Sequence, residues 1–590
     1  MNPEDDSRTL NLTVSIRGLA ESQYRTGGLA APFYGGVEGL AGIRTHQRYF
    51  DALRVDQRVS ELYTESSFSG MYRTEDTSLT VKGRADAWFL SQNGLTLVEV
   101  KSFRGAASRL PAKGEDVHWA QAKLYAYLLL LQTGAASLTI ELTYVSTEVD
   151  DDIVILRETE TLASLEAFFN RLCLSFIEST RSLRRYIAAR NEANRAASFP
   201  YDGLRDGQKL LMRRVMDTML AEGSLLASAP TGIGKTIATL YPALKAQANG
   251  IVDRIFYLTH TTATRIVAET ALADLRAAGF LVRAVTLYAK ESLCLEPDLY
   301  CDQRRCPYAL DYYERLPEAL SELYRLQVIN PESLLPIAKK HRLCPFELSL
   351  DVSSWCDVII CDYNYVYDPR VRLQRFFADV GETYAILVDE AHNLPSRARE
   401  MYSARLELDQ LTDVYTLLLN KELGPPTEGS DDLKAMVRRA AEETISLHNE
   451  LAAVASSLSE NEEGPKGFAR IDASIQAHET VMTETFLAAK RLPAHLIGKL
   501  SRLYRTYALL LETFNEWDGK LPLLHLWFDL AFFIRVGQTL FDYTYLITLG
   551  KTRSGRWQLS LQCLDASDRM AKSVSSQMAR VYFSATLTPM

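Results

Sequence analysis

One short segment, LLASAPTGIGKTIATL, limits the fold more than any other part of the sequence. An apolar run, Leu225–Ala227, leads into a loop of small residues, and a helical pattern begins at Lys235. Gly232 and Gly234 allow the loop backbone to curl so that its N–H groups point at phosphate oxygens. A strand, a phosphate loop and a helix in this order predict an α/β domain with a nucleotide site. The alternative is a chance glycine-rich turn.

The side chains of this loop are of the kinds that bind a nucleotide and its metal ion. We expect Lys235 to contact the β- and γ-phosphates and the Thr236 hydroxyl to bind Mg²⁺. Thr231 belongs to the same loop and is included, with the two glycines, among the nucleotide-binding residues. Ala229 stands where the usual motif has its first glycine, a change that still fits a tight turn. ATP and Mg²⁺ are therefore the predicted cofactors.

A second motif, within YAILVDEAHNL, supports the nucleotide site. The apolar run ends in Asp389, which is placed to hold Mg²⁺, and Glu390, which is placed to polarise the attacking water. His392 belongs to the same motif and is a further catalytic candidate. Upstream of the phosphate loop, Arg205 and Gln208 are candidates for the adenine edge, although a solvated helix start explains them nearly as well.

Together these segments resemble the core of a superfamily 2 helicase. APTGIGKT, DEAH and the final SAT, Ser584–Thr586, match its motifs I, II and III in the correct order. RIFYLTHTTATR resembles motif Ia, which contacts the DNA backbone in that family. The resemblance implies a RecA-like motor domain in which motif III couples ATP hydrolysis to movement. It also implies a second RecA-like domain, and because none follows motif III we expect a fragment of a longer helicase that does not unwind DNA alone.

The cysteines are unevenly placed, because six of the eight lie between Cys294 and Cys361. Four are candidate metal ligands: Cys294, Cys301, Cys306 and Cys344. Thiolates from two separate segments can close a tetrahedral site. The spacing lacks the C-x₂-C pattern usual for zinc, whereas a 4Fe–4S cluster tolerates irregular spacing, so we favour the cluster over zinc and over structural thiols. Cys356 and Cys361 lie in apolar, strand-like sequence and are expected in the core.

This arrangement resembles the XPD/DinG family of iron–sulfur helicases, in which four cysteines between motifs I and II hold the cluster. CDYNYVYDP, before motif II, also resembles that family. The resemblance implies 5′→3′ translocation on single-stranded DNA and an arch domain between motifs II and III. Apolar residues at helical spacing follow motif II, so we expect an all-helical insertion there.

The N-terminal region contains a hairpin signal, LTVKGRADAWFLSQNGLTLVEVKSF, with Asn93-Gly94 as its turn. A two-residue turn at this position would put Trp88 opposite Glu99 and Asp86 opposite Lys101. Opposed residues share a face of the sheet, as do residues two apart on one strand. We therefore expect Asp86, Glu99 and Lys101 to converge.

Two carboxylates and a lysine on one face suit metal-assisted cleavage of a phosphodiester, with Mg²⁺ or Mn²⁺ on Asp86 and Glu99. The alternative is a solvated polar face, which the apolar residues on both faces of LVEVK make less suitable. The pattern resembles the PD-(D/E)xK nucleases of RecB type. That resemblance adds Gln121 and Tyr125 on a downstream helix and His46 on an upstream one, where a capping or core histidine is an equal alternative.

The length of 590 residues predicts several cores, and we expect an α/β protein throughout. Its expected parts are a nuclease-like domain at 1–195, a first RecA-like domain in three parts at 196–290, 346–397 and 516–590, an iron–sulfur insertion at 291–345 and an arch-like insertion at 398–515.

The net charge of −9 argues against a surface coated for nucleic acid but allows a local basic channel. The N-terminus has no apolar signal region, and no stretch is apolar enough to span a membrane, so we expect a cytoplasmic protein, with a monomer favoured. The predicted function is an ATP-dependent DNA helicase with an associated nuclease, acting in DNA repair. The alternatives are a nuclease whose helicase half only positions DNA, and a non-catalytic DNA-binding protein.

Overall fold

The computed structural model describes residues 10–29, 37–92, 94–103, 110–146, 152–297, 306–377, 382–420, 430–460, 469–472, 485–490, 494–513, 520–552, 554–574 and 578–587. The chain forms two compact units. Unit 1 comprises residues 1–190, 301–325 and 335–348, and unit 2 comprises residues 191–300, 326–334 and 349–590.

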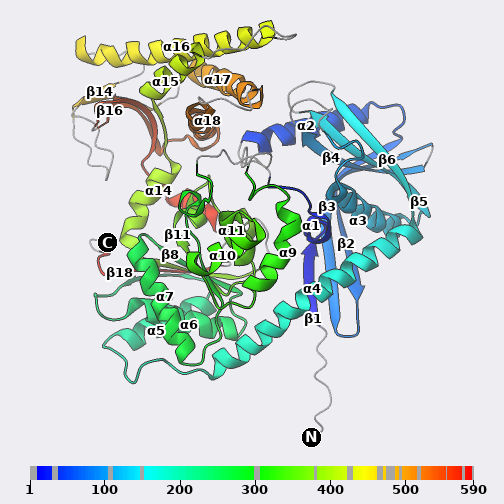
Figure 1. Ribbon diagram of the computed structural model, residues 1–590, viewed down its shortest axis with the longest axis vertical. Coiled ribbons are helices and arrows are strands. Elements are labelled where there is room, and N and C mark those ends of the chain that lie inside the picture. The colour runs from blue at the N-terminus through cyan, green and yellow to red at the C-terminus, as the bar shows by residue number, and fades with distance from the viewer. Residues whose placement is uncertain are drawn as a thin grey trace. The chain divides into compact units, whose positions relative to one another are not determined.

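Unit 1 is built on a six-stranded mixed sheet (Figure 1). Its strands are β1 (Leu10–Ser15), β2 (Glu61–Arg73), β3 (Thr77–Ser91), β4 (Gly94–Phe103), β5 (Ser137–Ser146) and β6 (Ile153–Thr161). The order is β1-β3-β4-β5-β6, and β2 pairs with β3. The helices are α1 (Ile16–Tyr24), α2 (Val37–Arg54), α3 (Asp116–Thr133) and α4 (Leu162–Ala196), which continues into unit 2.

The two faces of this sheet are both covered. Leu97 of β4 belongs to a core shared with α1, α3 and α4, whereas Val98 and Val100 pack with residues of α2. Residues on both faces of β4 are buried because helices pack on both faces of the sheet, while β3 and β5 pair with its two edges. The apolar residues on both faces of LVEVK therefore belong to an interior strand, as the sequence predicted.

The predicted register of the β3–β4 hairpin is wrong by two residues. Ser91 pairs with Gly94, so Trp88 lies opposite Leu97 instead of Glu99. Gly94 is the first residue of β4 at a φ of 111°, a conformation that glycine adopts easily, and its carbonyl accepts the Ser91 hydroxyl. A shift of two residues leaves every side chain on its predicted face because the period of a strand is two.

Unit 1 also contains the chain segment that carries Cys306 and Cys344. The segment 25–29 runs along it: Leu29 N donates to Ala309 O at 2.8 Å, and Tyr313 N donates to Gly27 O at 3.1 Å. Gly27 N donates to the Glu314 carboxylate at 2.8 Å. Residues 306–325 and 335–345 of the predicted cysteine insertion therefore group with the N-terminal sheet domain, whereas the segments that carry Cys294 and residues 326–334 belong to unit 2.

Unit 2 contains a parallel seven-stranded sheet in the order β10-β9-β11-β8-β12-β18-β7. These strands are β7 (Ser224–Ser228), β8 (Arg254–Thr259), β9 (Ala284–Thr286), β10 (Val328–Ile329), β11 (Val358–Asp362), β12 (Tyr384–Asp389) and β18 (Ala579–Ser584). The helices α5 (Gln208–Leu220), α6 (Lys235–Ala248) and α7 (Thr262–Ala277) share its main core. The predicted phosphate-loop strand, motif Ia strand and motif II strand are β7, β8 and β12.

Shorter helices connect these elements. They are α8 (Lys290–Leu293), α9 (Tyr312–Leu323), α10 (Pro331–His341), α11 (Pro345–Ser353), α12 (Asn364–Tyr367), α13 (Gln374–Phe377), α14 (Leu394–Tyr402) and α19 (Ser567–Ser573), with a 3-10 turn at Ala391–Asn393. The α9 helix lies in unit 1. The division between the units falls inside α10, after residue 334, and inside α11, after residue 348.

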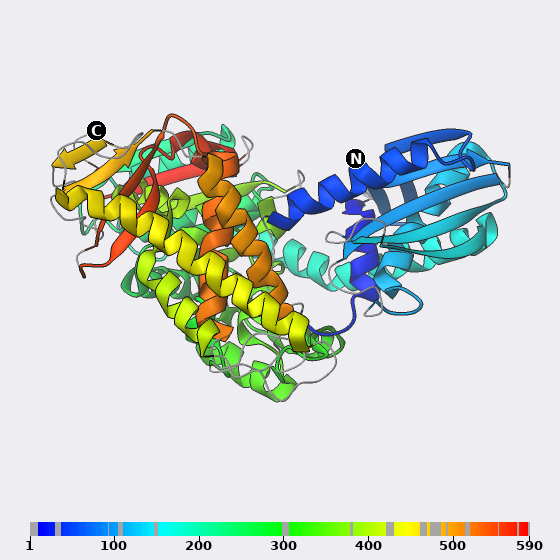
Figure 2. The same ribbon diagram turned by 90° about the horizontal axis from the view of Figure 1, so that it is seen from above.

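The insertion after motif II is not all-helical, which corrects the prediction. Its helices are α15 (Leu408–Leu419), α16 (Ser430–Glu460), α17 (Ala494–Thr513) and α18 (Lys520–Arg535), seen together in Figure 2. It also has an antiparallel sheet, β13-β17-β16-β15-β14. These strands are β13 (Ala404–Glu407), β14 (Ala469–Asp472), β15 (Thr485–Ala489), β16 (Tyr545–Lys551) and β17 (Trp557–Cys563).

The end of this insertion also differs from the expected boundary. Strands β16 and β17 pair with β13, so the insertion continues past residue 515 and the chain returns to the parallel sheet only at β18. The strand residues alternate or lie in short apolar runs such as "YLITLG", which helical spacing alone does not reveal.

Candidate active sites

The phosphate loop connects β7 to α6 in the predicted way. Gly232 and Gly234 have φ angles of 85° and 78°, in the left-handed region that favours glycine. Lys235 is the first residue of α6, so the loop ends at a helix N-terminus whose free N–H groups suit an anion. The residues of this loop therefore fit the phosphates of a nucleotide.

The side chains of Arg205 and Gln208 contact the phosphate loop. The Arg205 guanidinium donates to the Gly232 carbonyl, and the Arg205 backbone N–H donates to Gln208 Oε1 at 3.1 Å. Gln208 is only 2% exposed, and a Cβ at Gly234 would lie 2.8 Å from its amide nitrogen. The amide thus packs against the loop backbone, and its predicted role at an adenine edge stays a prediction.

Asp389 is a buried carboxylate at the end of β12, at 5% exposure. Its Oδ2 accepts the Tyr257 hydroxyl at 2.9 Å, and its Oδ1 accepts the Glu390 N–H at 2.9 Å. Burial raises the pKa of Asp389, and the charge of Lys235 opposes that shift. Tyr257 also lies within hydrogen-bonding reach of the Thr236 side chain. The two predicted Mg²⁺ ligands, Thr236 and Asp389, are therefore brought together around one tyrosine.

Motif III joins motif II through Ser584 at the end of β18. The Ser584 hydroxyl lies 3.0 Å from Glu390 Oε2 and 2.7 Å from His392 Nδ1. The Ser584 carbonyl accepts the Ala229 N–H of the phosphate loop at 2.9 Å. Three motifs distant in sequence thus meet at one serine, because β18 lies between β12 and β7 in the sheet.

Glu390 adopts a φ of 47°, unusual for a residue with a side chain. Tyr363 holds this turn by donating its hydroxyl to the carbonyls of Asp389 and Glu390. Strained backbone of this kind persists where surrounding contacts enforce it and is frequent at functional sites. Tyr257 and Tyr363 were missed in the sequence, although Tyr363 stands in the CDYNYVYDP segment.

The second candidate site lies on unit 1, where Asp86, Glu99 and Lys101 converge as predicted. Lys101 Nζ lies 2.8 Å from Glu99 Oε1. Asp86 Oδ2 accepts the Val100 N–H at 2.8 Å, beside Glu99. Glu99 is 2% exposed, and burial raises its pKa to about 7 while Lys101 opposes the shift.

Glu99 Oε2 is buried and has no hydrogen-bond partner among the described residues. A buried carboxylate oxygen normally has a partner, so this atom is the observation that suits a cation between Glu99 and Asp86. The donor set is also appropriate, because Mg²⁺ and Mn²⁺ prefer carboxylate oxygens. These two carboxylates therefore fit a divalent metal ion.

The α3 helix brings Gln121 and Tyr125 to the same place. Gln121 Oε1 accepts Lys101 Nζ at 3.0 Å. Burial raises the pKa of Tyr125, and Glu99 is the next largest cause. His46 behaves differently: it lies on α2, which packs against the opposite face of the sheet. Across the described ranges no three His, Cys, Asp or Glu side chains form a potential metal-binding group, so His46 does not complete such a group with Asp86 and Glu99.

Two further residues of α3 and its start, Glu115 and His118, were missed. His118 Nδ1 lies 3.0 Å from the Tyr144 hydroxyl, and Tyr144 pairs with Lys101 in the β4–β5 register. Burial, and after it the charge of Lys101, lowers the pKa of His118 to about 3. His118 precedes Gln121 by three residues, so the spacing of one helix face was the signal that could have found it.

The candidate cluster ligands are only partly described. Cys301 lies outside the described residues. Cys306 and Cys344 are partly exposed, and their segments adjoin, because Cys344 N donates to Tyr308 O at 2.9 Å. Cys294, also partly exposed, ends α8 in unit 2. Cys356 and Cys361 are buried at 1% and 0% exposure, which confirms the prediction that they are core thiols.

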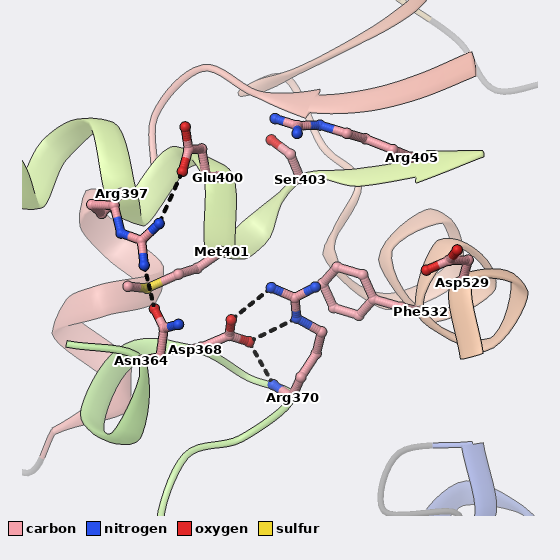
Figure 3. A pocket seen from close by; sticks show the side chains of 10 residues that line it. All are labelled: Asn364, Asp368, Arg370, Arg397, Glu400, Met401, Ser403, Arg405, Asp529 and Phe532. Atoms are coloured by element: carbon pink, nitrogen blue, oxygen red, sulfur yellow. Dashed lines mark hydrogen bonds and ion pairs between the residues drawn. The ribbon is translucent and has the colours of Figure 1, made fainter. Parts of the chain in front are cut away.

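A polar cavity of about 280 Å³ lies where the parallel-sheet domain meets the insertion (Figure 3). Its lining residues are Asn364, Asp368, Arg370, Arg397, Glu400, Met401, Ser403, Arg405, Asp529 and Phe532. Asp368 accepts two hydrogen bonds from the Arg370 guanidinium, which lies 4.7 Å from the Phe532 ring centre. None of the predicted nucleotide-site residues lines this cavity.

A parallel sheet with a phosphate loop, an acidic strand end and a bridging serine has the arrangement of a P-loop nucleotide-binding domain. Residues 258–411 match the DEAD_2 family. The chain is also 26% identical over 178 residues to a regulator of telomere elongation helicase 1 homolog of Anopheles gambiae. It is 26% identical over 247 residues to the general transcription and DNA repair factor IIH helicase subunit XPD/RAD3 of Saccharomyces cerevisiae.

These similarities cover 28% and 36% of this chain, and they span only 18% and 32% of the two relatives. A solved XPD helicase structure is 19% identical and covers 66% of this chain and 59% of that one. Its TM-score of 0.39 is too low to establish a shared fold. The matched part of the chain is thus similar to helicases of the XPD type. Among the described residues, none of the helices combines the length and apolar character of a membrane span.

Proposed function

We propose that this chain is the ATP-hydrolysing part of a DNA helicase of XPD/DinG type, carrying a metal-dependent nuclease domain at its N-terminus. The helicase relatives favour DNA as the partner and DNA repair or telomere maintenance as the setting. The observation that carries the motor proposal is the meeting of motifs I, II and III at Ser584. Translocation 5′→3′ is part of the same proposal.

At the motor site, each residue has a stated role. Lys235 binds the β- and γ-phosphates at the helix N-terminus, and Thr236 and Asp389 would hold Mg²⁺, which neutralises charge on the phosphates. Glu390 orients the attacking water and accepts its proton. Ser584 fixes the Glu390 carboxylate at 3.0 Å and His392 at 2.7 Å, so motif III positions the base. Arg205 keeps the loop in place through the Gly232 carbonyl.

At the nuclease site, Asp86 and Glu99 would hold Mg²⁺ or Mn²⁺, which lowers the pKa of a bound water. Lys101 lies 2.8 Å from Glu99 and stabilises negative charge that develops on the phosphate. Gln121 orients Lys101 through the 3.0 Å hydrogen bond. The observation that carries this second activity is the buried Glu99 Oε2 without a partner among the described residues.

The cysteines Cys294, Cys301, Cys306 and Cys344 would hold a 4Fe–4S cluster. The partial exposure of the three described members, in contrast to the buried Cys356 and Cys361, supports a ligand role for them. Iron and acid-labile sulfide should therefore co-purify with the protein at about four atoms each, as expected for this cluster. Zinc without sulfide would contradict the cluster.

Two assays on the whole chain test the function. ATP turnover stimulated by single-stranded DNA should be lost in Lys235→Ala and kept in Lys209→Ala, an exposed lysine of α5. Metal-dependent DNA cutting should be lost in Glu99→Ala and kept in Lys235→Ala. Cutting without any ATP turnover would favour the nuclease whose helicase half only positions DNA, and the absence of both activities would leave a non-catalytic DNA-binding protein.

A further inference from the structure

An aromatic pair lies beside the candidate nuclease site. Tyr63 of β2 and Trp88 of β3 are stacked, with ring centres 4.0 Å apart and ring planes 9° apart. Trp88 belongs partly to the core shared with α3, whereas Tyr63 is 43% exposed on the edge strand β2. One face of the Tyr63 ring rests on Trp88, and the exposed part of the residue is accessible to a ligand.

The register places this pair close to the carboxylates. Trp88 shares the sheet face of Asp86, two residues away on β3, and Tyr63 lies directly opposite Trp88. Tyr63 is therefore the diagonal neighbour of Asp86, at a typical backbone separation of about 7–8 Å. That distance corresponds to about two nucleotides at the ~3.4 Å rise of a stacked strand.

Both rings are held in place before any ligand binds. Trp88 Nε1 donates to the Ser66 hydroxyl at 3.1 Å, and the Tyr63 hydroxyl donates to Glu61 Oε2 at 2.9 Å. A platform that is already ordered loses little side-chain entropy on binding. The pair is thus suited to receive a flat group.

The edge strand is distorted at the same position. Glu65, which the register sets opposite Asp86, has a φ of 55°, and the strand pairing skips it. Distortions of this kind occur at sheet edges next to active sites, where they re-aim side chains. A cross-strand aromatic pair that served stability alone would not require a distorted edge beside it.

We propose that Tyr63, backed by Trp88, is a stacking platform for a base of single-stranded nucleic acid, one or two nucleotides from the phosphate cleaved at Asp86 and Glu99. The proposal rests on the proposed nuclease function of this site. Stacking of a base on an aromatic ring tolerates any sequence, because every base has a π-face. Single strands are the appropriate ligand because the bases of a duplex are already stacked on one another.

The test uses the 590-residue chain and a single-stranded oligonucleotide in which one abasic residue is moved, position by position, through the mapped cut site. For the wild-type protein, kcat/KM should fall about 5- to 150-fold at one position near the cut, the range expected for one base–aromatic stack. Tyr63→Leu should lower kcat/KM on intact DNA by the same factor and abolish the abasic effect. Tyr63→Phe, which keeps the ring, should behave as wild type.

The matched control is Tyr543→Leu, which removes a tyrosine that is 90% exposed in unit 2. It should leave cleavage and the abasic profile unchanged. An abasic profile that is flat for the wild-type protein overturns the platform while leaving the nuclease intact, and it needs no variant that must fold.

If the wild-type protein does not cut, the nuclease proposal fails and the platform is judged by binding. A 2-aminopurine base in a single-stranded oligonucleotide is quenched when it stacks. Quenching by the Glu99→Gln protein that is lost in Glu99→Gln/Tyr63→Leu supports the platform. Quenching that is equal in both proteins overturns it.

Discussion

The two candidate sites are assembled in different ways. The motor site gathers residues from segments as distant as Ala229 and Ser584, and its key carboxylate, Asp389, has hydrogen-bond partners on both oxygens. The nuclease site comes from one hairpin and the α3 helix, and its key carboxylate, Glu99, has one buried oxygen without a partner among the described residues. Both oxygens of Asp389 are therefore satisfied by the fold itself, whereas Glu99 has Lys101 on one oxygen only, which is where the proposed cation would bind.

This difference has an energetic meaning. A buried acceptor that lacks a partner carries a desolvation penalty of about 1–3 kcal/mol, or more when charged. Asp389 avoids much of that penalty through Tyr257 and the Glu390 N–H, although its pKa is still raised by burial. Glu99 carries the penalty in the metal-free protein, which is the physical reason for its pKa of about 7. Metal binding should therefore stabilise unit 1 more than unit 2.

The largest expected effect is a loss of ATP turnover, with DNA cutting retained, when the proposed base of the motor site is replaced. Glu390→Gln should lower ATP turnover by about 10²–10⁴-fold, the usual contribution of a general base, because glutamine cannot accept the proton. Binding of ATP, measured by isothermal titration, should remain, and so should metal-dependent DNA cutting. Glu442→Gln on the exposed face of α16 is the matched control. Loss of both activities in Glu390→Gln would mean that the sites are not independent.

A smaller effect is expected at the serine that joins the motifs. Ser584→Ala removes the contacts to Glu390 and His392 but leaves the backbone contact to Ala229. Hydrogen bonds to charged groups contribute about 1.5–3 kcal/mol, so turnover should fall about 10- to 150-fold with little change in ATP affinity. Ser567→Ala, at an exposed position that begins α19, should have no effect. Equal turnover in Ser584→Ala and wild type would remove motif III from the positioning of the base.

The motor site was more predictable from sequence than its surroundings. The phosphate loop, Asp389 and Glu390 are contiguous motifs whose local geometry follows from glycine positions and strand ends. Tyr257 and Tyr363 were not predictable, because a buried tyrosine reaches the site only through the order of strands in the sheet. Gln208 shows the same limit: its position before the loop was clear, but its burial against Gly234 depends on packing.

In unit 1 the face of each hairpin residue was predictable and the register was not. The period of two placed Asp86, Glu99 and Lys101 on one face whichever pair of residues formed the turn, so the site survived an error of two residues. The insertion failed for a different reason. Its sheet pairs β13 with β17, strands more than a hundred residues apart, and such long-range pairing leaves no local signal. Whether Cys294 and the other three thiols hold a cluster stays a prediction.

The raised pKa of Glu99 predicts that stability and metal affinity at this site depend on pH. Its pKa of about 7 in the folded protein lies above the usual glutamate value of 4.5, so the folded protein binds a proton more tightly than the unfolded chain between these values. Stability of the metal-free protein should therefore fall as pH rises from about 5 to 7. Metal affinity should rise about tenfold between pH 6 and pH 8, as the carboxylate loses its competing proton.

Both trends are measurable without activity, by urea unfolding of the metal-free protein and by Mn²⁺ titration at each pH. Glu99→Gln should remove the pH dependence of stability in this range because glutamine does not titrate. The motor site provides the internal comparison: Mg·ATP affinity should not follow the same profile. Metal affinity that is flat across pH 6–8 would contradict the role of Glu99 as a ligand.

The smallest effect concerns the cavity between the parallel-sheet domain and the insertion. Arg370 is paired with Asp368 and lies over Phe532 of α18 (Figure 3). Arg535 of α18 also donates to the Pro369 carbonyl at 3.2 Å. Phe532→Leu removes the cation–π contact, worth about 0.5–1 kcal/mol at a partly exposed site, and keeps most of the apolar volume. We expect a small decrease in thermal stability. We also expect a two- to fivefold change in DNA-stimulated ATP turnover, because α14 leads directly from motif II to this cavity. The control is Phe528→Leu, on the same helix but not lining the cavity. If Phe528→Leu changes stability as much as Phe532→Leu does, the contact to Arg370 is not the cause of the stability change.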